Sequence, residues 1–181
     1  MKKSGKPTVF IVRSAIIAAL YAVLTVAVAP LSYGAVQCRV SEALCVLAAF
    51  TPAAIPGLTA GCLIANAISF NPVDMLCGTA ATFVATVIAY KLRNVRVKGV
   101  PILTPLPAVL LNMLVVGLEL AVYMPVEGKS FAVGFAIQAA SVGAGQFVAC
   151  YLLGLPLYSL IDRTKLKKLL EDQEHGNYGN R

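Results

Sequence analysis

Three acidic side chains and one arginine stand within stretches of sequence that are otherwise apolar for dozens of residues. Arg39 and Glu42 lie three residues apart in QCRVSEAL, and Asp74 and Glu119 follow farther along the chain. A carboxylate can accept two N–H donors at once, and a guanidinium donates several hydrogen bonds in one plane. In apolar surroundings such groups need partners, so they predict a site that binds a small polar molecule.

Amide side chains accompany these charges. Asn112 lies seven residues before Glu119, which places both on one face of a helix. An amide offers a donor and an acceptor together, so it complements a ligand that carries both kinds of group. The candidate substrate-binding residues are therefore Arg39, Glu42, Asn66, Asn71, Asp74, Asn112, Glu119, Gln138 and Gln146.

Each candidate also has a purely structural explanation. Asn71 and Asp74 stand where the N-terminus of a helix favours capping side chains and carboxylates. Arg39 and Glu42 could pair with each other at their i,i+3 spacing, and the amides could form hydrogen bonds between helices. Glu119 fits a structural explanation least, because its own helix carries no basic residue nearby. Its expected partner is Arg39 or a donor on a ligand.

The elements that carry these side chains belong to an integral membrane protein. The chain has 181 residues, of which 59% are hydrophobic and 13% charged, and its mean hydropathy is +0.80. Soluble domains are usually about 25% charged. Several apolar runs reach the roughly 20 residues that a helix needs to cross a bilayer.

The net charge of +7 is concentrated in three clusters that flank the apolar runs. This distribution favours topology signals under the positive-inside rule over binding to nucleic acid. It predicts that the N- and C-termini are cytoplasmic and that the polar candidates gather toward the outer face. The clusters are Lys2, Lys3, Lys6 and Arg13; Lys91, Arg93, Arg96 and Lys98; and Arg163, Lys165, Lys167 and Lys168.

The apolar runs predict an all-α bundle of six transmembrane helices in one domain. A cytoplasmic N-terminus (1–9), a membrane domain (10–162) and a cytoplasmic polar tail (163–181) divide the chain. The first run precedes Ala27-Val28-Ala29, a pattern also found at signal-peptide cleavage sites, but its length favours an uncleaved helix. Four spans are expected over residues 10–29, 73–90, 101–123 and 131–161.

Residues 41–70 leave the count of crossings open. TPAAIPG divides this region into two pieces of about 10–14 residues, or about 15–21 Å of helix, whereas the bilayer core is about 30 Å thick. The pieces form either two short helices sheltered by their neighbours or a re-entrant hairpin. Both alternatives require a packed bundle, since irregular backbone at this depth is tolerated only inside protein or beside a cavity.

Small residues recur at four-residue spacing in the first span and in GLTAG (57–61). Such spacing lets helix backbones approach each other closely. The contact is either within this chain or with another membrane protein. The second alternative makes Ala15, Ala19 and Ala22 a candidate docking face for a partner.

Motifs of enzymes and metal sites are missing from the sequence. It contains no P-loop, HExxH or GxSxG pattern. Its five cysteines show no CxxC or Cys/His spacing, and its one histidine lies in the polar tail. We therefore expect no enzymatic activity, no cofactor, no metal site and no internal ATPase.

Three segments together resemble the QueT family of membrane proteins. They are the run from SYGAVQCRVSEAL to GCLIANAIS, the run PLPAVLLNMLVVGLEL, and GLPL. The similarity covers about residues 10–160. Members of this family are regarded as substrate-binding S components of energy-coupling-factor (ECF) importers for queuosine precursors.

The resemblance implies six transmembrane helices, of which the second and third are short. It further implies a pocket near the outer face and a place in the plasma membrane of a prokaryote. It also implies partnership with a transmembrane coupling (T) subunit and two cytoplasmic ATPases. The substrate would be a 7-deazaguanine base, whose N1–H and exocyclic amine one carboxylate can accept together. Glu119 or Glu42 is the expected acceptor, with Asp74 third. Gln146 departs from the acid that related sequences often carry, and an amide cannot hold a cationic amine by charge.

Two other functions remain open from the residues. One is an S component for another vitamin, such as a flavin or a pterin. The other is a structural membrane subunit without a ligand, in which the polar side chains only fasten helices together.

Overall fold

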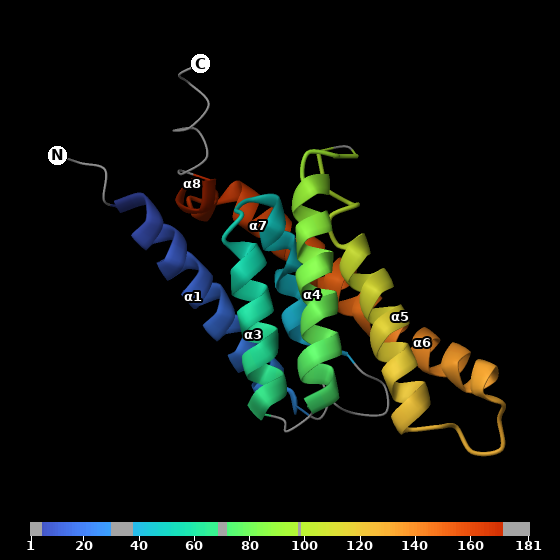
Figure 1. Cartoon of the computed structure of the whole chain (residues 1–181). Helices are drawn as coiled ribbons and strands as arrows, with labels where there is room; N and C mark the ends of the chain where they lie inside the picture. Colours follow the sequence, from blue (N-terminus) through green and yellow to red (C-terminus); the bar gives the residue numbers. More distant parts are fainter. Residues whose placement is uncertain (1–4, 30–37, 69–71, 98, 172–181) are drawn as a thin grey trace.

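A computed structural model describes residues 5–29, 38–68, 72–97 and 99–171, and these are entirely helical apart from turns and one isolated bridge between Val97 and Val100. Figure 1 shows the helices side by side in one bundle. In chain order they are α1 (Gly5–Ala27), η1 (Val40–Ala49), α3 (Ala54–Ile68), α4 (Pro72–Leu92), α5 (Leu106–Tyr123), α6 (Phe131–Phe147), η2 (Val148–Leu153), α7 (Gly154–Arg163) and α8 (Leu166–Glu171).

Four stretches of helix are long and apolar enough to cross a membrane. They are Pro7–Ala27, Pro72–Leu92, Leu106–Tyr123 and Phe131–Arg163. These correspond to the four spans expected from the sequence, with ends that differ by a few residues. The short apolar helices η1 and α3 occupy the region that the sequence left open, so within the described residues four spans are long enough to cross a membrane alone.

The first short helix, η1, is a 3₁₀ helix in the interior of the bundle. Its ten residues rise about 2.0 Å each, so η1 is about 20 Å long. Every residue from Ser41 to Ala49 is buried. Because the neighbouring helices cover these residues, η1 presents almost no surface to lipid.

Close helix packing holds α1 against α3. A side-chain carbon on Gly57 would lie 2.8 Å from Cβ of Ile17, and one on Gly61 would lie 2.7 Å from Cβ of Tyr21. Only glycine permits these approaches. The GLTAG motif therefore packs within the chain, which is the intramolecular alternative of the sequence analysis.

The last span changes its helical geometry at one turn. Between α6 and α7, η2 is a π-helix of six residues that ends just before Pro156. Proline has no N–H to donate and its ring clashes with the carbonyl four residues earlier, here Leu152. A widened turn relieves that clash.

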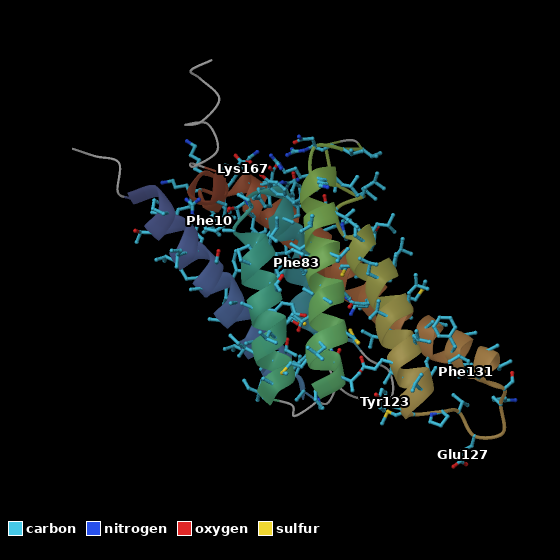
Figure 2. The ribbon with its side chains drawn as sticks, viewed as in Figure 1. Phe10, Phe83, Tyr123, Glu127, Phe131 and Lys167 are labelled. Atoms are coloured by element: carbon cyan, nitrogen blue, oxygen red, sulfur yellow. The ribbon has the colours of Figure 1, made fainter. Side chains whose placement is uncertain are left out.

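The helix ends that carry the three basic clusters of the sequence meet at one end of the bundle. The N-terminal end of α1, the C-terminal end of α4 and helix α8 all lie at this end in Figure 1, and Figure 2 shows Lys167 there, with Glu127 at the opposite end. We call these the basic end and the distal end. The terminal segments predicted as 1–9 and 163–181 lie partly outside the described residues.

Candidate functional site

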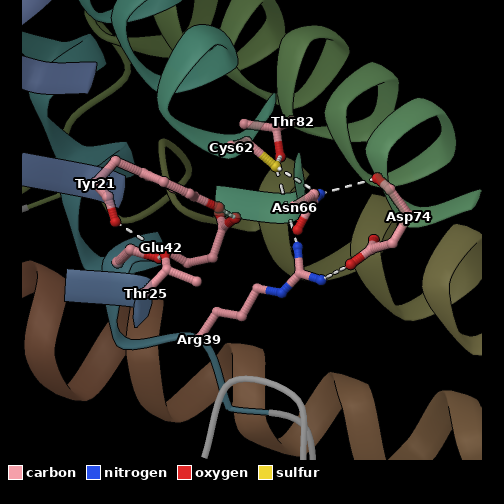
Figure 3. Close-up of polar contacts among 9 residues, drawn as sticks. Tyr21, Thr25, Arg39, Glu42, Cys62, Asn66, Asp74 and Thr82 are labelled. Carbon is pink, nitrogen blue, oxygen red and sulfur yellow. Dashed lines mark hydrogen bonds and ion pairs between the residues drawn. The ribbon is translucent and has the colours of Figure 1, made fainter. Parts of the chain in front are cut away.

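A cluster of buried polar side chains lies inside the bundle where η1 begins, α3 ends and α4 begins. Figure 3 shows its members, which come from four helices and the residue before η1. Packing around it is apolar, so each polar group depends on partners within the cluster. This polar cluster comprises Tyr21, Thr25, Arg39, Ser41, Glu42, Cys62, Asn66, Asp74 and Thr82.

An ion pair joins Arg39 to Asp74 at the centre of the polar cluster. Nη2 of Arg39 donates to Oδ2 of Asp74, and the two side chains are only 3% and 1% exposed. Asp74 stands in the first turn of α4, where the helix dipole also favours a carboxylate. Among the described residues, Arg39 forms this ion pair with Asp74 and none with Glu42, the partner that their i,i+3 spacing suggested.

Glu42 instead receives a hydrogen bond from α1. The hydroxyl of Tyr21 donates to Oε1 of Glu42 at 2.5 Å, a length typical of strong O–H···O⁻ bonds. Beside it, the hydroxyls of Thr25 and Ser41 lie 2.6 Å apart. Two carboxylates thus reach the polar cluster from different elements, and each is engaged by a different donor.

The sulfur of Cys62 gathers three donors from three elements. Thr82 Oγ1 lies 3.4 Å from this sulfur, Asn66 Nδ2 lies 3.5 Å away, and Arg39 Nη1 lies 4.0 Å away. Asn66 also donates to the backbone carbonyl of Asp74 at 2.9 Å. Cys62 therefore connects α3, α4 and η1, although sulfur is a weak acceptor.

Gln146 lies next to the polar cluster on α6. Its Oε1 is 3.7 Å from the sulfur of Cys150, and that sulfur is 3.6 Å from the backbone carbonyl of Glu42. Gln146 is itself buried. A single cysteine thus connects the side-chain amide of Gln146 on α6 with the backbone of Glu42 on η1.

The helix α5 carries two further candidates. Asn112 is 1% exposed, and neither its Oδ1 nor its Nδ2 has a hydrogen-bond partner within the described part of the chain. Glu119, two turns farther along α5, is half-buried, and its Oε2 is shielded from solvent. Both lie on α5 as expected, and the amide of Asn112 has capacity for a polar ligand.

The structure brings five of the nine candidates together. Arg39, Glu42, Asn66, Asp74 and Gln146 lie in or beside the polar cluster. Gln138 donates to the backbone carbonyl of Met124 at 3.1 Å and so fastens the turn between α5 and α6. Asn71 lies outside the described residues.

Tyr21, Cys62 and Thr82 belong to the polar cluster but were not predicted. Tyr21 carried a usable signal, because a tyrosine in the middle of an apolar helix needs a partner for its hydroxyl. Cys62 and Thr82 carried none, since both residue types are common in membrane helices without any ligand.

The residues of the candidate docking face differ in exposure. Ala15 and Ala19 are exposed on α1, whereas Ala22 is only 8% exposed. A residue as buried as Ala22 cannot present itself to a partner in this conformation. The part of the expected face that is open therefore consists of Ala15 and Ala19.

Comparison with known proteins assigns the chain to a family. A family model described as QueT transporter matches residues 11–163. The chain belongs to the QueT transporter family. Membership of this family, together with the long apolar helices, supports a multi-pass membrane protein.

One relative is informative. The protein named Queuosine precursor transporter QueT from Lactococcus lactis subsp. cremoris (strain MG1363) is 45% identical over 86 residues, which are 46% of this chain and 50% of that protein. The match thus spans about half the length of this curated QueT relative. No solved structure matches the chain.

Proposed function

We propose that this protein is the substrate-binding S component of an ECF-type importer that takes up a queuosine precursor. The observation that carries the proposal is the buried polar cluster, with two carboxylates, in a member of the QueT transporter family. A multi-pass protein keeps charged side chains in its interior at a cost of several kcal/mol. Such groups are retained most readily where a substrate uses them.

The chemistry of a 7-deazaguanine suits the polar cluster. Its N1–H and exocyclic amine are adjacent donors that a single carboxylate can accept, by analogy with base recognition worth about 1–3 kcal/mol. The guanidinium of Arg39 offers Asp74 N–H donors of the same kind. We therefore propose Asp74, alongside Glu42 and Glu119, as a carboxylate that accepts hydrogen bonds from these two donors of the base. The amide of Asn112 would form hydrogen bonds with the remaining polar atoms of the substrate.

The charge distribution supports an orientation with both termini in the cytoplasm. All basic clusters within the described residues lie at the basic end, and the positive-inside rule assigns such an end to the cytoplasm. The polar cluster lies toward the distal end, so substrate would enter from outside the cell. In this proposal η1 and α3 are the second and third of six helices, in the plasma membrane of a prokaryote.

Transport in this proposal requires other subunits. The chain contains no P-loop, so energy would come from two cytoplasmic ATPases through a membrane-embedded T subunit. Ala15 and Ala19, exposed on α1, are the proposed contact with that T subunit. No cofactor or metal takes part.

A ligand-free structural subunit is the second candidate, because the polar cluster satisfies many of its own hydrogen bonds. Calorimetry on the purified protein in detergent separates the two. We expect submicromolar binding of queuine or a pre-queuosine base and none of riboflavin. Riboflavin binding alone would indicate another vitamin, and no binding by any compound would favour the structural subunit.

The same titration tests the candidate on α5. Glu119→Gln should weaken binding of the 7-deazaguanine at least about tenfold, because glutamine replaces one of the two acceptor oxygens with an NH2 donor that faces a donor on the base. Glu127→Gln is a matched control, since Glu127 is an exposed carboxylate at the distal end. Equal affinity for wild type and Glu119→Gln would remove Glu119 from the site.

A further inference from the structure

An apolar groove lies between α1 and the C-terminal helices, apart from the polar cluster. Its volume is about 310 Å³, at the lower end of the range of about 300–1,000 Å³ for small-molecule sites. Eight of its nine lining residues are aliphatic. They are Ile16, Ile17, Leu20, Leu47, Ile161, Leu166, Leu169 and Leu170, and the ninth is Arg13.

Arg13 has donors left over in this groove. Its Nη1 donates to the backbone carbonyl of Leu170 at 3.0 Å, which ties α1 to α8. Its Nε is shielded from solvent and has no hydrogen-bond partner among the described residues. No ion pair of Arg13 is found in that part of the chain either. Arg13 is half-buried, so the exposed part of its guanidinium can meet a ligand, and it is suited to an anionic oxygen, above all to phosphate.

The helix α8 gives the groove the character of a membrane interface. Leu166 and Leu169 line the groove and are also more than half exposed. The sequence TKLKKLLE places lysines between these leucines, a pattern typical of helices that lie at the headgroup level. Lys167 keeps its charge there, because its hydrogen bond to Asp162 raises its pKa.

We propose that this groove binds one anionic glycerophospholipid, with an acyl chain along the leucines and isoleucines and its phosphate at Arg13. Charge complementarity selects this occupant, since basic side chains near a membrane surface each attract anionic lipid. The basic cluster that continues the site is Arg163, Lys165, Lys167 and Lys168. This site does not depend on the proposed function.

Native mass spectrometry and thermal melting of the full chain in mild detergent test the proposal. We expect phosphatidylglycerol to remain bound as a single adduct and to raise the melting temperature with concentration. Phosphatidylcholine with the same acyl chains, and inorganic phosphate alone, should do neither. Equal retention of phosphatidylcholine, or equal stabilisation by inorganic phosphate, would overturn the proposal.

Variants locate the site. Arg13→Gln should reduce retention of phosphatidylglycerol at least about fivefold, whereas Lys91→Gln should not, because Lys91 is an exposed basic residue at the same end on α4. If Arg13→Gln does not fold, Leu169→Glu replaces it, since Leu169 is 63% exposed and a carboxylate there repels phosphate. Wild-type retention in the folded variant, or a second copy of the chain in place of lipid, would refute the site.

Discussion

Arg39 shows what an apolar bundle requires of a charged side chain. It lies beside the start of η1, and its ion pair reaches a residue 35 positions along the chain. Removing one partner of a buried ion pair leaves a charge without compensation, and such changes cost about 3–5 kcal/mol. The pair therefore stabilises the junction of η1 and α4 whether or not a ligand is present.

Asp74→Asn tests this at the scale of one residue. We expect the free energy of unfolding to fall by about 3–5 kcal/mol, because Arg39 stays buried without its counter-charge. Asp162→Asn is the matched control, since its ion pair with Lys167 is one-third exposed and should cost at most about 1 kcal/mol. Unfolding in detergent with increasing denaturant measures both. Similar losses for the two variants would contradict a buried ion pair at Asp74.

The sequence predicted which polar residues belong to the candidate site, but it did not predict which of them interact with each other. Arg39, Glu42, Asn66 and Asp74 stand out because polar groups in apolar runs are rare. Spacing along one helix predicts only local pairs, so it suggested Glu42 for Arg39. The actual pair depends on how η1 and α4 pack, which no local pattern encodes.

At the scale of helices, the long spans were predictable, and two short helices were one of the two alternatives for residues 41–70, but the 3₁₀ geometry of η1 was not predicted. The spans α1, α4 and α5 have apolar runs of membrane length bounded by proline or basic residues, and these signals fixed their ends to within a few residues. A 3₁₀ helix lacks the 3.6-residue period of an α-helix. In η1 nearly every residue is buried, so no polar face marks its geometry either.

Gly61→Ala tests the contact between α1 and α3. The added methyl group would lie 2.7 Å from Cβ of Tyr21 and 2.8 Å from the carbonyl oxygen of Ala18, so the helices must separate, at about 1–3 kcal/mol. Gly134→Ala on α6 is the control, because its nearest neighbour would be 3.8 Å away. Melting temperatures in detergent report the difference. Equal temperatures would show that α1 and α3 do not pack this closely.

At the scale of the whole molecule, charge and polarity are segregated along the bundle. The helix ends that carry the three basic clusters lie at the basic end, whereas the ends of α3 and α4 that carry the polar cluster lie toward the distal end. The faces of α1 are divided as well: one packs on α3, one borders the lipid groove, and Ala15 and Ala19 remain open. A single helix therefore supports internal packing and leaves two surfaces for external contacts.

Ala19→Trp tests the proposed contact with a T subunit. We expect co-purification with that subunit to be lost, because an indole prevents close helix approach, while binding of a 7-deazaguanine is retained. Ala132→Trp is the control, since Ala132 is equally small and exposed but lies on α6. Retention of the T subunit by Ala19→Trp would show that docking uses another surface.

The burial of η1 has a consequence for how the protein enters the membrane. A helix of about 20 Å that offers lipid almost no surface gains little by partitioning into a bilayer on its own. Its stability in the membrane comes from packing against the helices that contact it, which are α1, α3, α4, α7 and η2. Because η2 and α7 follow α4, α5 and α6 in the chain, η1 cannot complete its surroundings until these later helices have been made. Biogenesis of this protein is therefore not a series of independent insertions, since its centre is assembled after its periphery.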